Sequence, residues 1–399
     1  MVGMMRLGPR AAAACQLAVG AVLLVWGLVR GSIVPRDFIV VDADAPTDRK
    51  LYESIVAAMQ GSGGRDPIGY YEAVAQQQHA IGAPTSPVFT VREPTLAWVV
   101  ASIGETAAAV LLGVVALVAL VLAVQLLDAV TDTRWEWYPA TLVAGLGVLW
   151  LALPGRLWFH EVWAGLLLLL AVAVLRSRWW WAALPIALLA VMVREMAIVL
   201  PVACLLVALW QRRRREVAAW SVVLVLAVGF FAWHAWQVHE HVPPYATGPG
   251  WTGLQGWPFV VNATWFSSPL WLAPAVVAAV VTVLAGLGWT GRLGRAVPEG
   301  IVLLLLVAVA VALGGRPDNL YWGALWVPLL SLGLVPGLRR VRELLTALRS
   351  RRAPVRSEAG GSGVEYALVL GFVTTAIVAV VVVFGPMTVD YVGGLRLFD

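Results

Sequence analysis

Hydrophobic residues in this chain gather into long unbroken runs and seldom alternate with polar ones. An α-helix needs about 20 apolar residues to cross the hydrocarbon of a bilayer, and fewer where aromatic residues flank it. The runs that meet this criterion are 11–29, 105–127, 139–153, 160–175, 179–193, 196–210, 217–238, 269–287, 301–313, 321–335 and 364–384. The pattern therefore predicts an all-α polytopic membrane bundle of about 11 transmembrane helices.

Two polar stretches between these runs are too long to be simple turns. The first, 30–94, carries eight acidic residues and has helical patterns at 51–60 and 70–79. The second, 239–268, is rich in glycine, proline and tryptophan. Long loops on one face of a bundle are where binding and catalytic residues concentrate, so we expect function in these two loops.

Composition and charge support a membrane protein and set its orientation. Hydrophobic residues make up 60% of the chain and charged residues only 13%, against about 25% charged in soluble domains. Alternating the runs from a cytoplasmic N-terminus puts most of the 28 basic residues inside, which predicts an extracytoplasmic C-terminus in a bacterial cytoplasmic membrane. The net charge of +5 then reports orientation and predicts no nucleic-acid partner. Cys15 and Cys204 both lie in apolar runs, so no disulfide framework is expected.

Two aspartates in the first loop share the pattern D-x-x-x-Y with a following tyrosine. Asp48 precedes Tyr52, and Asp66 precedes Tyr70, each at the start of a predicted helix. A helix cap explains either aspartate equally well. The alternative is a general base that accepts the proton of an attacking hydroxyl. Asp48 and Asp66 are rival candidates for this base, and Asp44 is a third.

Further ionisable and polar residues are predicted on the same outer face. Charged groups at a bilayer are costly and point to a function unless they form an ion pair or mark the interface. The candidate substrate-binding residues, with the two tyrosines above, are Arg92, Glu93, His160, Glu161, Arg194, Glu195, Arg316, Asp318 and Tyr321. The guanidinium fork of arginine suits a phosphate. No metal-ligand spacing is diagnostic, and the short sequence His239-Glu-His241 is a weak match, so no metal site is predicted.

This layout resembles the GT-C class of multi-spanning glycosyltransferases. The lipid A aminoarabinose transferase and protein mannosyltransferase branches are similar in the first loop at Asp66, Tyr70, Gly82, Pro87, Pro94 and Leu96. This chain has Arg92-Glu-Pro where those branches show a lysine or histidine followed by two prolines. The resemblance covers 1–340 by topology and leaves the substrate subclass open.

The resemblance implies the substrates of a membrane glycosyltransferase. The donor would be a polyprenyl-phosphate-linked sugar, and the acceptor an extracytoplasmic glycan, lipid or protein. Arg194 and Arg316 would then hold the lipid phosphate, with His160, Glu161 and Asp318 as supporting or acceptor contacts. No cofactor is certain. A divalent cation that stabilises the leaving phosphate is the one cofactor that the resemblance leaves open.

The C-terminal part differs from the rest of the chain in composition. A basic and glycine-rich linker covers 341–363, and the segment 364–399 consists of the last apolar run followed by a short tail. It resembles a Flp-type (type IVb) prepilin. Counted from Gly361, Glu365 is residue five and Tyr366 residue six, which implies cleavage between Gly360 and Gly361 by a prepilin peptidase. Cleavage would release 399 − 360 = 39 residues. An ordinary last span and a gene fusion are the alternatives.

Three classes of function remain open from the sequence. A polyprenyl-phosphate-dependent glycosyltransferase is the leading hypothesis. A pilus-assembly or structural membrane protein, in which the Flp-like tail is the working part, is the second. A lipid or solute transporter is the third, although transporters usually carry internal repeats and we find no convincing repeat.

Overall fold

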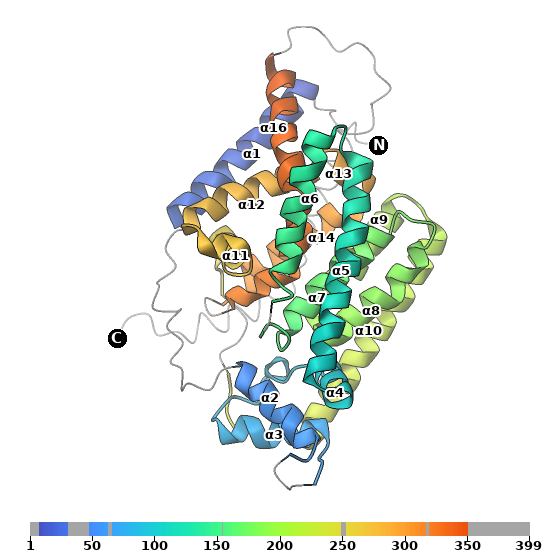
Figure 1. The fold of residues 1–399 in the computed structure, drawn as a ribbon, viewed down its shortest axis with the longest axis vertical. Helices are drawn as coiled ribbons and strands as arrows, with labels where there is room; N and C mark the ends of the chain where they lie inside the picture. Colours follow the sequence, from blue (N-terminus) through green and yellow to red (C-terminus); the bar gives the residue numbers. More distant parts are fainter. Residues whose placement is uncertain are drawn as a thin grey trace, which may run out of the picture.

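The computed structural model describes residues 8–30, 48–62, 66–153, 155–248, 253–316 and 319–349. Over these residues the protein is all-α, which confirms the all-α part of the predicted fold class (Figure 1). An isolated bridge between Ser86 and Thr247 ties the first long loop to the second. The candidate residues Asp44, Asp318, Gly360, Gly361, Glu365 and Tyr366 lie outside the described residues.

The helices follow the predicted apolar runs closely at several boundaries. The α-helices are α1 (Pro9–Arg30), α2 (Asp48–Met59), α3 (Tyr70–Ala80), α4 (Thr95–Ile103), α5 (Glu105–Val130), α6 (Arg134–Leu149), α7 (His160–Val174), α8 (Ala183–Val193), α9 (Val199–Trp210), α10 (Arg214–His241), α11 (Gly256–Phe266), α12 (Ala275–Trp289), α13 (Arg292–Ala296), α14 (Pro298–Gly314), α15 (Val327–Leu332) and α16 (Leu334–Arg349). Short 3-10 helices are η2 (Val88–Thr90), η3 (Trp180–Ala182), η4 (Glu195–Ile198), η5 (Pro269–Leu272) and η6 (Leu320–Leu325).

The apolar helices differ in length. Within the described part of the chain, α1, α5 and α10 are the three that are long and apolar enough to cross a membrane. Shorter apolar helices are α7, α8 with η3, α9 with η4, α12 and α14. The helices thus support a membrane protein, and the larger number of about 11 spans remains a prediction.

Two parts of the sequence fold differently from the prediction. The run 321–335 is not one helix but is divided into η6, α15 and the start of α16. The second long loop contains α11, whose residues Phe259, Val260 and Val261 are buried in the bundle. A short apolar stretch flanked by glycine and proline gives too weak a pattern to be recognised as a buried helix.

Close backbone approaches explain why these segments depart from the pattern. A Cβ added at Gly323 in η6 would lie 2.0 Å from the carbonyl oxygen of Ala263 in α11. A Cβ at Gly165 in α7 would lie 2.0 Å from the carbonyl oxygen of Ala324. Small residues let helices in membranes pack backbone to backbone. The three elements α7, α11 and η6 are held together in this way, and η6 carries Tyr321 into the centre of the bundle.

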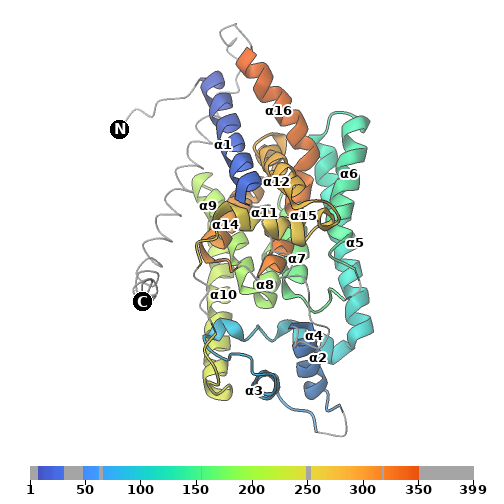
Figure 2. The same ribbon diagram turned by 90° about the vertical axis from the view of Figure 1, so that its left-hand side faces the viewer.

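The molecule has two distinct ends, which the two views in Figures 1 and 2 agree on. The first-loop helices α2, α3 and α4 gather at the lower end, and α16 projects at the upper end. Arginine and carboxylate groups pair near the base of α16, with Arg339 Nη1 at 2.8 Å from Glu136 and Arg340 Nη1 at 2.9 Å from Glu343. Because α16 continues to Arg349, residues 341–349 of the predicted linker are helical, and the rest of that linker lies outside the described residues.

Candidate functional site

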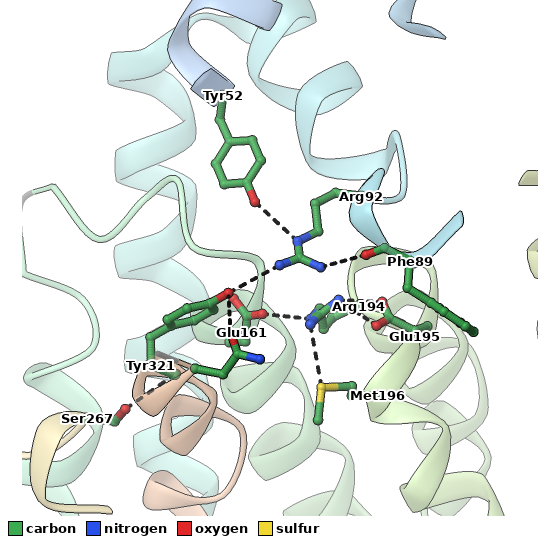
Figure 3. A network of polar contacts seen from close by, with 10 residues as sticks. Tyr52, Phe89, Arg92, Glu161, Arg194, Glu195, Met196, Ser267 and Tyr321 are labelled. Carbon is green, nitrogen blue, oxygen red and sulfur yellow. Dashed lines mark hydrogen bonds and ion pairs between the residues drawn. The ribbon is translucent and has the colours of Figure 1, made fainter. Parts of the chain in front are cut away.

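Five segments that are far apart in the sequence meet around two arginines, between the first-loop helices and the rest of the bundle (Figure 3). They are α2, the turn before α4, the first turn of α7, the junction of α8 with η4, and η6. The predicted residues that this junction brings together are Tyr52, Arg92, Glu93, His160, Glu161, Arg194, Glu195 and Tyr321. We call this set the arginine cluster.

Arg194 lies at the centre of the arginine cluster and is completely buried. Its extended backbone, with φ −151° and ψ 113°, ends α8 and separates it from η4. The guanidinium contacts two carboxylates, with Nε 2.7 Å from Glu161 and Nη1 2.5 Å from Glu195. It also lies 5.9 Å from the ring centre of Trp322. Arg194 therefore holds α7, η4 and η6 together, and its charge is balanced by direct contact with acidic groups.

Arg92 has a different environment, because its hydrogen bonds among the described residues go to neutral oxygens. Its Nε donates to the Tyr52 hydroxyl and its Nη2 to the Tyr321 hydroxyl, both at 3.2 Å, and its Nη1 donates to the carbonyl of Phe89. The Tyr70 hydroxyl donates to the Arg92 carbonyl at 2.6 Å, which fixes this turn on α3. The side chain is half-buried. Arg92 is thus held in place by neutral groups and makes no direct contact with a carboxylate among the described residues.

His160 begins α7 and packs beside Tyr52. Their ring centres are 5.0 Å apart in an edge-to-face arrangement, and His160 is 4% exposed. Its Nδ1 is buried with no hydrogen-bond partner among the described residues. A gap of about 10 Å³ between these rings and Leu96 has room for roughly one water molecule. A sugar does not fit in this gap.

Glu93 shares the buried end of the arginine cluster with Glu195. Glu93 is 2% exposed. Its burial is the main cause that raises the pKa of its carboxyl well above the usual range, and the negative charge of the neighbouring Glu195 is the next cause. With Glu93 protonated, the charges of Arg92 and Arg194 balance those of Glu161 and Glu195. The cluster is then neutral as a whole, which lowers the cost of burying it.

We expect Glu93→Gln to make the stability of the protein less dependent on pH. A raised pKa means that the folded protein keeps a proton that the unfolded chain releases above about pH 4.3. The free energy of unfolding of the wild type therefore falls as pH rises from there through the raised pKa, whereas the amide has no proton to lose. Unfolding temperatures measured between about pH 5 and 8 test this. The exposed Glu72→Gln is the matched control, and an unchanged pH profile in Glu93→Gln contradicts the assignment.

The two rival aspartates occupy different places. Asp48 lies in the first turn of α2, one helical turn before Tyr52 and therefore on the same face. Burial is the largest cause that raises the pKa of the Tyr52 hydroxyl, and the charge of Asp48 is a further one. Asp66 is exposed and four residues before α3, whose N-cap is Gly69, so Asp66 does not cap that helix. Only Asp48 of this pair is within electrostatic reach of the arginine cluster.

Some residues near the arginine cluster were not predicted from the sequence. Asn319 accepts a hydrogen bond from the Tyr321 hydroxyl at 3.5 Å, and Met196 accepts one from Arg194 at 3.5 Å. Asn319 belongs to the same polar turn as Arg316, which lies half-buried directly after α14, so proximity in sequence was a usable signal. Met196 gave no signal because a methionine in an apolar run is ordinary.

Comparison with known proteins gives no further assignment: no protein-family model, no curated protein and no solved structure matches this chain. The part of the chain that the structure describes holds no group of three or more histidine, cysteine, aspartate or glutamate side chains suited to a metal ion. What can be said about function therefore rests on the geometry of the arginine cluster.

Proposed function

We propose that this chain is an integral membrane glycosyltransferase that uses a polyprenyl-phosphate-linked sugar, with Arg92 as the residue that binds the lipid phosphate. The observation that supports this most directly is the set of neutral hydrogen-bond partners around Arg92. Because these partners are neutral, Arg92 can exchange them for an incoming anion without breaking a direct ion pair, whereas Arg194 contacts two glutamates directly. The geometry thus favours Arg92 over Arg194 for the phosphate.

The residues around Arg92 suit the leaving group of such a transfer. As the glycosidic bond to phosphate breaks, the electron pair moves to a phosphate oxygen and negative charge grows there. A guanidinium fork stabilises this charge, and the O–H group of Tyr52, which accepts from Arg92 and keeps its own proton, is the next donor. Preorganised donors of this kind supply a large part of the rate in many enzymes.

Asp48 is the residue that we assign to the general base. The acceptor hydroxyl attacks the anomeric carbon from the side opposite the phosphate, and its proton passes to the Asp48 carboxylate as the new bond forms. The configuration at the anomeric carbon is inverted. Asp48 is exposed and on the same face of α2 as Tyr52, so an acceptor can approach it from the extracytoplasmic side assigned to this loop.

We expect Arg92→Gln to weaken binding of a polyprenyl phosphate by about 10- to 100-fold. Hydrogen bonds to charged groups contribute about 1.5–3 kcal/mol, and each 1.4 kcal/mol is about tenfold in Kd. Binding is measured on the purified full-length protein in detergent with undecaprenyl phosphate and with the uncharged undecaprenol. The exposed Arg215→Gln at the other end of the molecule is the control. Equal loss of both lipids in Arg92→Gln, or no loss of either, contradicts a phosphate site at Arg92.

The transporter and the pilin-like tail, which the sequence also suggests, stay hypotheses. A transporter would also bind the phosphate at Arg92, but it would need no base at Asp48. The pilin-like tail, its cleavage after Gly360 and the prepilin peptidase as a partner lie with residues outside the described ranges, and they remain predictions from sequence. The same holds for the sidedness of the termini.

A further inference from the structure

A second feature of the described residues, at the other end of the bundle, is unrelated to the arginine cluster. A cavity of about 260 Å³ lies between α1, α11, α12 and α14, and its lining is almost entirely apolar. Val19 of α1 lines it and is 49% exposed, so the cavity reaches the outer surface of the bundle. Since α1 is long and apolar enough to cross a membrane, a membrane-spanning α1 would turn this opening toward lipid hydrocarbon.

The polar residues of the cavity meet at one place. Gln16 and Thr290 both line it, and the Gln16 Oε1 accepts hydrogen bonds from Thr290 at 3.4 Å and from Arg340 Nη2 at 3.0 Å. Arg340 also pairs with Glu343, yet its Nε is buried with no partner among the described residues. The cavity is therefore apolar along its length and has a guanidinium behind its polar rim.

The surroundings of this rim carry a positive balance. The neighbouring basic residues of α13 and α16 are Arg292, Arg295, Arg339, Arg340 and Arg342, and the acids that pair with some of them are Asp132, Glu136 and Glu343. Arg292, Arg339 and Arg340 pair with these acids, and Arg295 and Arg342 add positive charge on the same two helices. An anionic group at the rim is favoured by this added positive charge.

We propose that this cavity is a binding site for an anionic glycerophospholipid, with one acyl chain between α1, α12 and α14 and the phosphate at the rim near Arg340. A volume of about 260 Å³ is at the lower limit of pockets for small molecules, roughly 300–1,000 Å³, and it suits a single chain. A helix, with a diameter of about 10–12 Å, is too wide for it. The combination of an apolar channel with a basic rim fits an amphiphile with a negative headgroup.

The structure offers a substitution that fills the cavity without disturbing its walls. A Cβ added at Gly286, which lines the cavity in α12, meets no atom within 4 Å. A side chain at this helical position adds no backbone strain, and we expect the ring in Gly286→Phe to enter the cavity that Gly286 lines. Gly229 in α10 likewise has no atom within 4 Å of an added Cβ, so Gly229→Phe is a matched control outside the cavity. For the headgroup, the pair is Arg340→Gln with Arg349→Gln as control, because Arg349 is exposed at the far end of the same helix and is not part of the rim.

The experiment uses the full chain in liposomes that contain phosphatidylglycerol or phosphatidylcholine with the same photoreactive acyl chain. After irradiation, labelled peptides are identified by mass spectrometry. We expect at least fivefold more label on α1, α12 and α14 from phosphatidylglycerol than from phosphatidylcholine. Gly286→Phe should remove that label at least fivefold, Arg340→Gln should remove the headgroup preference, and both controls should behave as wild type.

Three results would overturn the proposal. One is unchanged labelling of these helices in Gly286→Phe, and another is an unchanged headgroup preference in Arg340→Gln. The third is stronger labelling of the cavity by a photoreactive polyprenyl phosphate than by phosphatidylglycerol, which would make the cavity a site for a donor lipid. Because Gly286→Phe and Arg340→Gln alter different parts of the site, failure of one variant to fold leaves the other decisive.

Discussion

Arg194→Met is expected to destabilise the folded protein by about 3–5 kcal/mol, the range for removing one partner of a buried ion pair. Arg194 is 0% exposed, and its loss leaves Glu161 and Glu195 in the interior without their direct counter-charge. The unfolding temperature, followed by size-exclusion chromatography of heated detergent samples, should fall well below that of the wild type.

A compensating variant separates charge from packing in this experiment. Arg194→Met combined with Glu161→Gln and Glu195→Gln removes the unpaired carboxylates, and it should recover most of the lost stability, because a buried ion pair replaced as a whole by neutral groups costs far less than one that is broken. The exposed Arg178→Met is the matched single control. A single Arg194→Met variant as stable as the wild type would show that Arg194 does not hold the arginine cluster together.

Much of the helical architecture could be predicted from hydrophobic patterning, because long apolar runs have few other ways to satisfy their backbone in a bilayer. Helices begin at His160 and at Tyr70, as predicted, although α7 as a membrane span stays a prediction. The division of 321–335 could not be predicted, since it follows from the close approach of Gly323 to Ala263, residues that are distant in sequence. Patterning reports which residues avoid water but not which backbones touch.

In the candidate site too, the sequence shows which residues are unusual but not which residues they contact. Charged residues that interrupt apolar runs, such as Arg194, are visible in the sequence because they are costly in a membrane. Their partners are not, since Arg92 reaches the Tyr321 hydroxyl across 229 positions of the chain. From the sequence we assign the lipid phosphate to Arg194 and Arg316, and it is the pairing of Arg194 with two glutamates that moves the proposal to Arg92.

Asp48→Asn is expected to lower the rate of sugar transfer by about 100- to 10,000-fold, the range for loss of a general base. The asparagine keeps the size and polarity of the side chain, and it cannot accept the proton of the acceptor hydroxyl. Binding of undecaprenyl phosphate, which depends on Arg92, should stay within about twofold of wild type, because a base acts on the acceptor and not on the donor phosphate. Transfer is measured on the full chain in liposomes with a panel of polyprenyl-phosphate sugars.

The matched control is Asp66→Asn, which alters the other exposed aspartate of the same D-x-x-x-Y pattern. Its transfer rate should stay near that of the wild type, since Asp66 neither caps α3 nor lies within electrostatic reach of the arginine cluster. Loss of transfer in Asp66→Asn alone would move the base to the second pattern. Full transfer in both variants would exclude both aspartates as the base. A wild-type protein that binds the phosphate but transfers no sugar would favour a transporter.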